Sequence, residues 1–421
     1  MHCLPTEHTR QLARLRTLVH VIGHVRSQPS PKGFRRLIAI EEVSKRYADG
    51  TVAVDRLSLQ IPNHSITVLV GPSGCGKTTT LRMINRMVEP SSGTIRVNGE
   101  DILRRPVNAL RQSMGYVIQN AGLFQHRTVL DNIATVPRLL GWSKQRARAR
   151  ASELMERVGL DREMARRYPY QLSGGQQQRV GVARALASDP PILLMDEPFS
   201  AVDPVVRRGL QEELLRIQGE LGKAIVFVTH DMDEAIRIGD RIAVMRTGGH
   251  LAQFAAPDEL LSSPADAFVE EFLGGDRGIR GLSFLSTRDL ELDRSRVFPV
   301  GTDRKQIAGS GDAQPPVLIT DDAGKPLGWA DPTVWGGDVQ ALEPYGQSFE
   351  VGRDSLRVAL DRAVLSPTGQ AVAVDGAGRV LGVAGQETVA AAIRAARQRR
   401  AESAESPSDT AQDPSQVKAV R

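Results

Sequence analysis

The chain has 421 residues, of which 41% are hydrophobic and 24% charged, a balance typical of globular proteins rather than disordered ones. This length allows two or three domains. No apolar run approaches the roughly 20 residues of a membrane-spanning helix, and the N-terminal apolar stretches are too short and interrupted for a signal peptide. The two cysteines, Cys3 and Cys75, exclude a disulfide framework and favour a reducing cytoplasm.

The net charge of +5 is concentrated at the N-terminus. Residues 1–36 carry seven basic residues against one acid, a net charge of +6, so the rest of the chain is close to neutral. This basic arm could contact anionic lipid or nucleic acid, or it could be a solvated extension or the product of an upstream start codon. We expect it to be disordered, and the charge of the whole chain is therefore no evidence of nucleic-acid binding.

From residue 37 the pattern becomes that of a compact domain. Apolar runs predict strands at 37–47, 52–61 and 65–70, and a helix follows at about 77–87. Residues 146–160 predict an amphipathic helix with Leu154 and Val158 on its apolar face. The remaining pattern is a helix after Ser173, a strand at 191–197, a helix within 205–222, a strand at 224–230 and a helix at 232–239. Strands that alternate with helices predict a mostly parallel α/β sheet.

After about residue 280 the chain contains an internal repeat. Residues 317–330 recur at 372–384 with a constant offset of 54, which pairs Asp321 with Asp375. Each copy predicts a strand, an Asp/Gly turn and a strand. Residues 354–364 predict an amphipathic helix with Asp354 or Ser355 as its N-cap. We expect two packed copies of one small α/β unit over residues 285–395, followed by a polar, disordered tail at 396–421.

A phosphate-binding loop is the strongest chemical signal. The sequence GPSGCGKT matches G-x-x-x-x-G-K-[ST] and lies between a buried strand and a helix. Glycines let main-chain N–H groups close around phosphates, Lys77 adds a positive charge at the β and γ oxygens, and the Thr78 hydroxyl can ligate Mg²⁺. The predicted nucleotide-binding residues are Gly71, Pro72, Ser73, Gly74, Cys75, Gly76, Lys77, Thr78 and Thr79.

Besides a phosphate-binding loop, phosphoryl chemistry needs a metal ligand and a group that activates water, and two acidic residues can supply these. Four apolar residues at 192–195 form a buried strand that delivers Asp196 toward a metal, and Glu197 is placed to orient or deprotonate a water. His230, Gln119 and Tyr47 carry little information alone, because a lone histidine after a strand is more often a capping or core residue.

The order of the motifs changes this interpretation. With LSGGQ at 172–176 and SAVDP around Asp203, they resemble the ATP-binding cassette (ABC) family over residues 37–275, which implies a P-loop NTPase cassette with a helical subdomain at about 120–175. The family's cassettes pair head to tail, so Ser173, Gly174, Gly175 and Gln176 would contact the partner's ATP. The resemblance further implies that Tyr47 stacks on adenine, Gln119 contacts the metal and senses the γ-phosphate, Asp196 binds the metal, Glu197 activates water, His230 contacts the γ-phosphate and Asp203 bridges the subunits. Val202 stands where the family usually has Leu.

Several runs, among them QQQRVGVARALASDPPILLMDEP, look like the ATP-binding subunits of importers for glycine betaine, choline, carnitine or proline betaine. The resemblance implies ATP and Mg²⁺ as cofactors, and a homodimer bound to integral-membrane permease subunits at the cytoplasmic face of the inner membrane. A solute-binding protein would be an indirect partner, and no nucleic acid is expected.

The C-terminal repeat resembles a pair of cystathionine-β-synthase (CBS) modules. Neither copy has the Thr/Ser and Asp that follow a Gly by three and six residues in nucleotide-binding modules, so we expect a dimer contact or a charge-based sensor. Two alternatives stay open for the whole chain. One is a cassette importer for another amino-acid or cationic solute, and the other is a soluble cassette ATPase acting on DNA or ribosomes, although the chain lacks the coiled-coil insertion or second cassette expected there.

Overall fold

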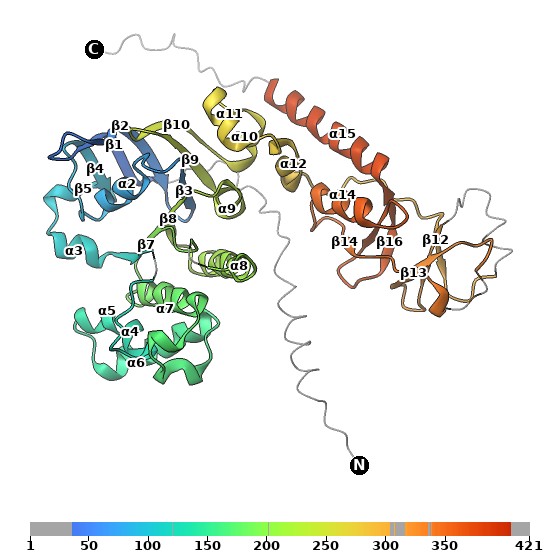
Figure 1. The fold of residues 1–421 in the computed structure, drawn as a ribbon, viewed down its shortest axis with the longest axis horizontal. Helices are drawn as coiled ribbons and strands as arrows, with labels where there is room; N and C mark the ends of the chain where they lie inside the picture. Colours follow the sequence, from blue (N-terminus) through green and yellow to red (C-terminus); the bar gives the residue numbers. More distant parts are fainter. Residues whose placement is uncertain are drawn as a thin grey trace, which may run out of the picture. The chain divides into compact units, whose positions relative to one another are not determined.

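The computed structural model describes residues 36–405, apart from residues 120, 201, 304–306, 308–315, 336 and 338. Contacts divide the chain into two compact units, and the division falls between Arg277 and Gly278 (Figure 1). The basic arm, apart from Arg36, and Cys3 lie outside the described residues. Among the helices that the structure describes, each is too short or too polar to cross a bilayer.

Two sheets form the first unit. One has the order β2-β1-β4-β5 and is antiparallel, with strands β1 (Arg36–Arg46), β2 (Val52–Pro62), β4 (Ser92–Val97) and β5 (Glu100–Asp101). The other has the order β10-β9-β3-β8-β7-β6, with β3 (Ile66–Val70), β6 (Met114–Val117), β7 (Ile192–Asp196), β8 (Ala224–Thr229), β9 (Arg241–Arg246) and β10 (His250–Ala255). All its pairs are parallel except β9 with β10, which confirms the predicted mostly parallel core.

Parallel pairing brings the chemical motifs to one edge of this sheet. Strands β3, β7 and β8 are buried along their whole length, as continuous apolar runs in the middle of a parallel sheet require. The carboxyl ends of the three strands lie side by side because they are parallel neighbours. The phosphate loop follows β3, Glu197 follows β7 and His230 follows β8, at the edge where such folds place their ligands.

Some helices of the first unit pack on the large sheet, and others form a helical region of their own. The helical region contains α4 (Val129–Ile133), α5 (Thr135–Leu139), α6 (Lys144–Arg157) and α7 (Gly174–Leu186), and α4, α6 and α7 pack on one another. Leu154 and Val158 are buried, as the amphipathic pattern predicts. The other helices of this unit are α2 (Lys77–Ile84), α3 (Val107–Gln112), α8 (Pro204–Leu221), α9 (Met232–Ile238), α10 (Pro257–Ser262) and α11 (Ala267–Leu273), and α12 (Arg277–Gly281) spans the division between the units.

The second unit contains two three-stranded sheets of the same design. In each, the first strand is parallel to the second and the second antiparallel to the third. The strands are β11 (Val297–Pro299), β12 (Val317–Thr320) and β13 (Pro326–Ala330), then β14 (Ser348–Glu350), β15 (Gln370–Val374) and β16 (Val380–Gly385). Oδ1 of Asp321 and of Asp375 each accepts two main-chain N–H bonds in the turn between the second and third strands. The repeat is therefore structural as well as sequential.

The two copies interlock. Asp293, ahead of the first copy, pairs with Val383 of the second, and Glu343, ahead of the second copy, pairs with Trp329 of the first. A shared core includes Leu318 and Trp329 with their repeat partners Val372 and Val383. Each copy thus completes the other, which explains why the repeat occurs as a pair.

Two expectations about element ends were wrong, and one was confirmed. Helix α2 ends at Ile84 because Arg86 has a positive φ of 53°. The N-cap of helix α14 (Leu356–Leu365) is Ser355, one of the two residues expected there, although its side chain makes no capping hydrogen bond. Helix α15 (Gln386–Glu405) extends through residues 396–405, which are rich in Ala, Arg, Gln and Glu and therefore favour helix rather than the expected disorder. The rest of the tail, 406–421, lies outside the described residues.

Candidate active site

The phosphate loop joins β3 to α2, and two of its glycines cannot be replaced without a clash. A Cβ on Gly71 would lie 2.3 Å from the Met245 carbonyl oxygen. Gly76 is the N-cap of α2 with a φ of 92°, and a Cβ there would lie 2.3 Å from the Ala53 carbonyl oxygen. The backbone of the loop is therefore pressed against β9 and β2, and only glycine permits this path.

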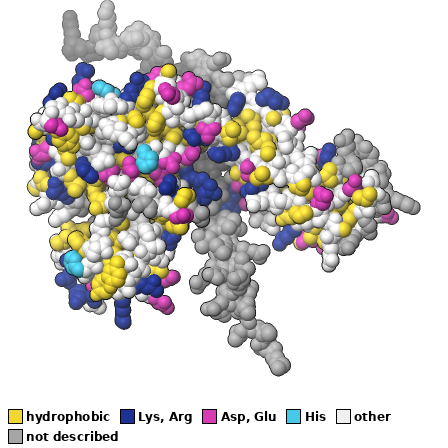
Figure 2. Space-filling view, in the orientation of Figure 1, with side chains coloured by type: hydrophobic (Ala, Val, Ile, Leu, Met, Phe, Trp, Pro, Cys, Tyr) yellow, Lys and Arg dark blue, Asp and Glu magenta, His cyan; other side chains and the backbone are white. Residues whose placement is uncertain are grey.

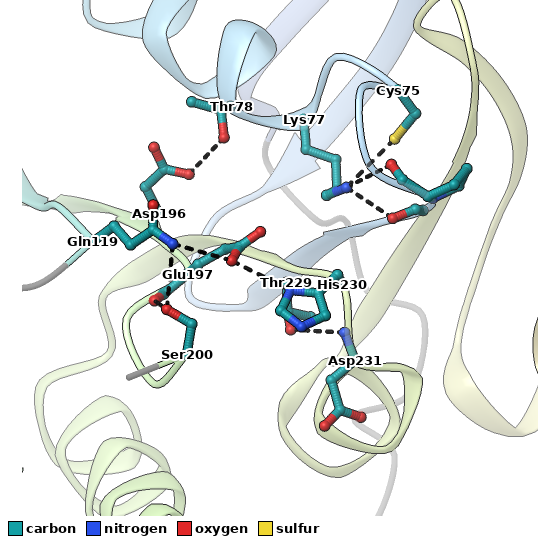
Figure 3. A network of polar contacts seen from close by, with 12 residues as sticks. Cys75, Lys77, Thr78, Gln119, Asp196, Glu197, Ser200, Thr229, His230 and Asp231 are labelled. Atoms are coloured by element: carbon teal, nitrogen blue, oxygen red, sulfur yellow. Dashed lines mark hydrogen bonds and ion pairs between the residues drawn. The ribbon is translucent and has the colours of Figure 1, made fainter. Parts of the chain in front are cut away.

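Lys77 fills the loop from within. Its Nζ donates to the carbonyls of Gly71 at 2.7 Å and Pro72 at 2.9 Å, and lies 3.6 Å from Sγ of Cys75 (Figure 3). Lys77 is 6% exposed, and Cys75 is a buried free thiol. The loop thus holds a buried cation on main-chain oxygens, a charge that complements a phosphate group.

Thr78 and Asp196 meet as expected. The Thr78 hydroxyl donates to Oδ1 of Asp196 over 2.8 Å, although the residues are 118 positions apart. The Tyr116 hydroxyl donates to Oδ2 of the same carboxylate at 3.4 Å, and Arg82 lies 3.7 Å from it. Burial, and then the Asp196 charge, raise the pKa of Tyr116. Asp196 is 5% exposed, so hydroxyl and carboxylate oxygens form a small, sheltered cluster at the end of β7.

Glu197 adopts a strained conformation that turns its carboxylate toward two other predicted site residues. Its φ is 43°, which non-glycine residues rarely adopt, and its N–H donates to the Val228 carbonyl at 3.1 Å. Oε2 lies 3.2 Å from Nδ1 of His230 and 3.5 Å from Nε2 of Gln119 (Figure 3). The structure therefore brings together the three residues predicted to be catalytic.

Residues that the sequence did not single out complete this group. Gln119 Nε2 is also 3.5 Å from the Ser200 hydroxyl, which donates to the Glu197 carbonyl at 3.0 Å. Glu234 of α9 is 6% exposed, and burial raises its pKa. It accepts a hydrogen bond from Gln211 at 3.0 Å and shares a recess with Glu197 and His230. The sequence could not indicate the pair of Gln211 and Glu234, because it joins different elements, whereas Ser200 is the first residue of SAVDP and lies three positions from Glu197.

The Ser173 turn lies elsewhere, at the start of α7. Its hydroxyl accepts from the Gln176 N–H at 3.3 Å, and the Gln176 side chain accepts from the Ser173 N–H at 3.0 Å, a complete capping box. Ser173 and Gly174 are exposed, whereas Gly175 is buried and a Cβ there would lie 2.8 Å from Val206. Among the described residues, no polar contact joins this turn to the phosphate loop.

The remaining predicted residues lie around the loop and on its flanks. Ser73 and Gly74 are exposed at the loop tip, and Thr79 is half-buried on α2. Tyr47 lies in the β1–β2 turn, 40% exposed, with the Lys45 ammonium 5.3 Å from its ring centre. Asp203 precedes α8, where its carbonyl accepts from the Arg207 N–H at 2.8 Å.

The chain is similar to several known proteins. A family model described as "ABC transporter" matches residues 54–200. The osmoprotectant import ATP-binding protein OsmV of Salmonella typhimurium is 42% identical over 376 residues, 87% of this chain and 98% of the relative. The glycine betaine/carnitine/choline transport ATP-binding protein OpuCA of Bacillus subtilis is 49% identical over 261 residues, 62% of this chain and 68% of the relative. The structure of cbiO1 from Clostridium perfringens, part of the ABC transporter complex cbiONQ, matches with a TM-score of 0.51 and 28% identity, over 55% of this chain and 92% of that one.

Proposed function

Because the chain belongs to the ABC transporter family, as an ATP-hydrolysing subunit of an importer, we propose that it drives uptake of a quaternary amine osmolyte such as glycine betaine, choline, carnitine or proline betaine. The observation that carries the enzymatic part is the meeting of Thr78, Asp196, Glu197 and His230 at one sheet edge beside the phosphate loop. The names of the relatives support the choice of solute.

The residues present fit a magnesium ion. Mg²⁺ prefers oxygen ligands and is usually held by one or two protein groups together with substrate phosphates. The Thr78 hydroxyl and the Asp196 carboxylate are such donors, and Gln119 has a side-chain oxygen to offer. When bound, the ion would neutralise charge on the β- and γ-phosphates.

The other polar residues would then act on the γ-phosphate. Lys77 can donate to its oxygens, and Glu197 can take the proton of a water that attacks phosphorus as the bond to the β–γ bridging oxygen breaks, which releases ADP and phosphate. His230, 3.2 Å from Glu197, can donate to the transferred group. Gln119 approaches the same carboxylate and can report whether the γ-phosphate is present.

We also propose that two copies of the chain act as a head-to-tail dimer. The exposed Ser173 turn presents N–H groups at the positive end of α7, a favourable place for a phosphate of the partner's ATP. Tyr47 would stack on adenine, and Asp203 would contact the second subunit. Closure over the nucleotide would exclude water and add stabilising dipoles to the transition state.

Permease subunits at the cytoplasmic face of the inner membrane would contact the dimer and change conformation when it closes over the nucleotide. Leu139, Tyr170 and Phe124 of the helical region are 77%, 72% and 42% exposed, and Figure 2 shows hydrophobic side chains beside Lys and Arg on this lobe. Such exposed apolar side chains suit contact with another protein. The C-terminal unit would be a CBS-like pair that serves as a dimer contact or senses charge.

Two measurements test the proposal. The purified full-length chain should release phosphate from ATP, and this release should need Mg²⁺. Cells that lack the chain should lose high-affinity uptake of radiolabelled glycine betaine or choline at high osmolarity, and the wild-type chain should restore it. Restored uptake of a different amino acid or cation alone would support the alternative importer class.

A further inference from the structure

Arg184 is a half-buried basic residue whose guanidinium is directed at a main-chain turn. It lies in the last turn of α7, and its two terminal nitrogens donate to the Gly122 carbonyl at 2.8 Å and the Ala121 carbonyl at 2.7 Å. Burial lowers the pKa of the guanidinium. Both hydrogen bonds run to backbone oxygens, so this arrangement fixes a loop at the cost of desolvating a charge.

The loop that Arg184 holds begins at Gln119. Ala121 and Gly122 have positive φ angles of 56° and 52°. The Ala121 N–H donates to the Ile118 carbonyl at 3.2 Å. The turn whose carbonyls accept from Arg184 is therefore hydrogen-bonded to the residue that precedes Gln119. Gly181 of α7 allows this close approach, since a Cβ there would lie 3.3 Å from the Ala121 Cβ. One face of α7 therefore positions the start of the loop.

The contacts between the Gln119 side chain and the residues around Glu197 are long. The Gln119 Nε2 is 3.5 Å from both Glu197 and Ser200, at the outer limit of a hydrogen bond. A small displacement of the loop therefore decides whether Gln119 bonds to the catalytic carboxylate.

Resting on the proposed function, we propose that Arg184 is a positioning residue for Gln119 and makes α7 a rigid link between the two half-sites of one chain. The first turn of α7 carries Ser173, which would face the partner's nucleotide. The last turn of α7 holds the loop that begins at Gln119, and Gln119 would face the nucleotide bound by the same chain. The helix has 13 residues and is about 20 Å long, so one element reaches both.

The test compares phosphate release and amide exchange in full-length variants. Arg184→Gln should lower kcat by about tenfold to a hundredfold, as a misplaced catalytic group does. Arg184→Lys should retain more activity than Arg184→Gln, because it keeps a cationic group whose N–H donors can still bond these carbonyls. The matched control is Arg179→Gln, also on α7, where Arg179 donates to the Gly159 carbonyl at 2.8 Å and does not touch the Gln119 loop.

A double-mutant cycle separates positioning from general damage. If Arg184 acts through Gln119, Arg184→Gln should add little to Gln119→Ala. Effects that multiply, or an Arg184→Gln variant as active as Arg179→Gln, would overturn the inference. Hydrogen–deuterium exchange at residues 121–127 provides a readout that needs no turnover: it should accelerate in Arg184→Gln but not in Arg179→Gln, and unchanged exchange would also overturn the inference. A wild-type chain that hydrolyses no ATP would instead contradict the proposed function.

Discussion

At the scale of single residues, the backbone of Glu197 is the clearest sign of a site built for chemistry. A left-handed conformation at a non-glycine residue costs about 1–3 kcal/mol and persists only where neighbours enforce it. Here the hydrogen bond to Val228 enforces it, and the result is a carboxylate turned toward His230 and Gln119. An exposed strand end would have no need of this conformation.

We therefore predict that Glu197→Gln lowers phosphate release by about 100-fold or more, because the amide cannot accept the proton of the attacking water. ATP binding should persist, since the phosphate loop is untouched. Turnover can be followed by phosphate release and binding by equilibrium dialysis with labelled ATP. Glu163→Gln, at an exposed position of the helical region, is the control. Wild-type turnover in Glu197→Gln would remove this residue from the proposed role.

Glu234 leads to a pH prediction. Burial raises its pKa in the folded protein above the ordinary value of 4.5, so the folded state holds this proton more tightly than the unfolded state. The stabilisation that the protonated Glu234 contributes to the folded state is complete below pH 4.5, and it is lost as the pH rises through the pKa of Glu234 in the folded protein. The titratable and charged side chains around it are those of Glu197, Asp231, Arg207 and His230.

Glu234→Gln keeps an oxygen that can accept from Gln211 but removes the charge. We expect the variant to melt at a higher temperature than the wild type at pH 8, by about 2–4 °C for each kcal/mol relieved, and with little difference at pH 4. Thermal melts of both proteins across this range measure the difference. A constant offset at every pH would mean that the carboxyl group does not titrate as inferred.

At the scale of elements, two serines offer a matched comparison. Ser173 caps α7 and Ser143 caps α6, each by accepting a main-chain N–H bond three residues on. Replacing either by Arg loses a cap worth about 1 kcal/mol. Only Ser173→Arg should also abolish turnover, because only that turn would contact the partner's nucleotide, and ATP binding by isolated subunits should be nearly unchanged. Equal losses of activity in both variants would point to stability alone.

Local patterns in the sequence predicted much of this architecture. The buried runs of β3, β7 and β8, the phosphate loop and the amphipathic α6 depend on nearby residues, and each lies where expected. The antiparallel sheet of β1, β2, β4 and β5 and the contacts of Tyr116 and Glu234 depend on pairings between distant segments, which periodicity does not encode. Helix ends depend on single backbone angles, as at Arg86, and were the least predictable feature.

The interlocked repeat yields a prediction about its glycines. A Cβ on Gly328 would lie 2.6 Å from the Glu343 carbonyl oxygen, where the segment ahead of the second copy crosses the first. Gly328→Ala should therefore destabilise the second unit by about 1–3 kcal/mol, the usual cost of overpacking. Gly281→Ala, with open space around its Cβ position, is the control. Urea unfolding followed by circular dichroism compares them, and equal midpoints would contradict the close crossing.

At the scale of the whole molecule, the alignment with the Salmonella relative covers 87% of this chain, so it extends beyond the first unit into the interlocked repeat. A shared second unit suggests a shared task besides catalysis. If that task is the proposed charge sensing, the exposed basic residues of the unit would carry it, because exposed charges respond to ionic strength through screening over a Debye length of about 8–10 Å.

Helix α15 is the element on which to test this idea. Arg397 and Arg399 are exposed on it, and Arg399 lies 3.3 Å from Asp289. If the unit senses charge, replacing both arginines by Gln should flatten the response of ATP hydrolysis to salt in vesicles that contain the chain and the proposed permease subunits, while activity at the optimum salt changes little. Arg104→Gln with Arg162→Gln removes the same charge from exposed positions of the first unit and should leave the response intact. Identical salt curves for the two double variants would leave the repeat with a purely structural role, because the lost charge would then have no effect specific to its position.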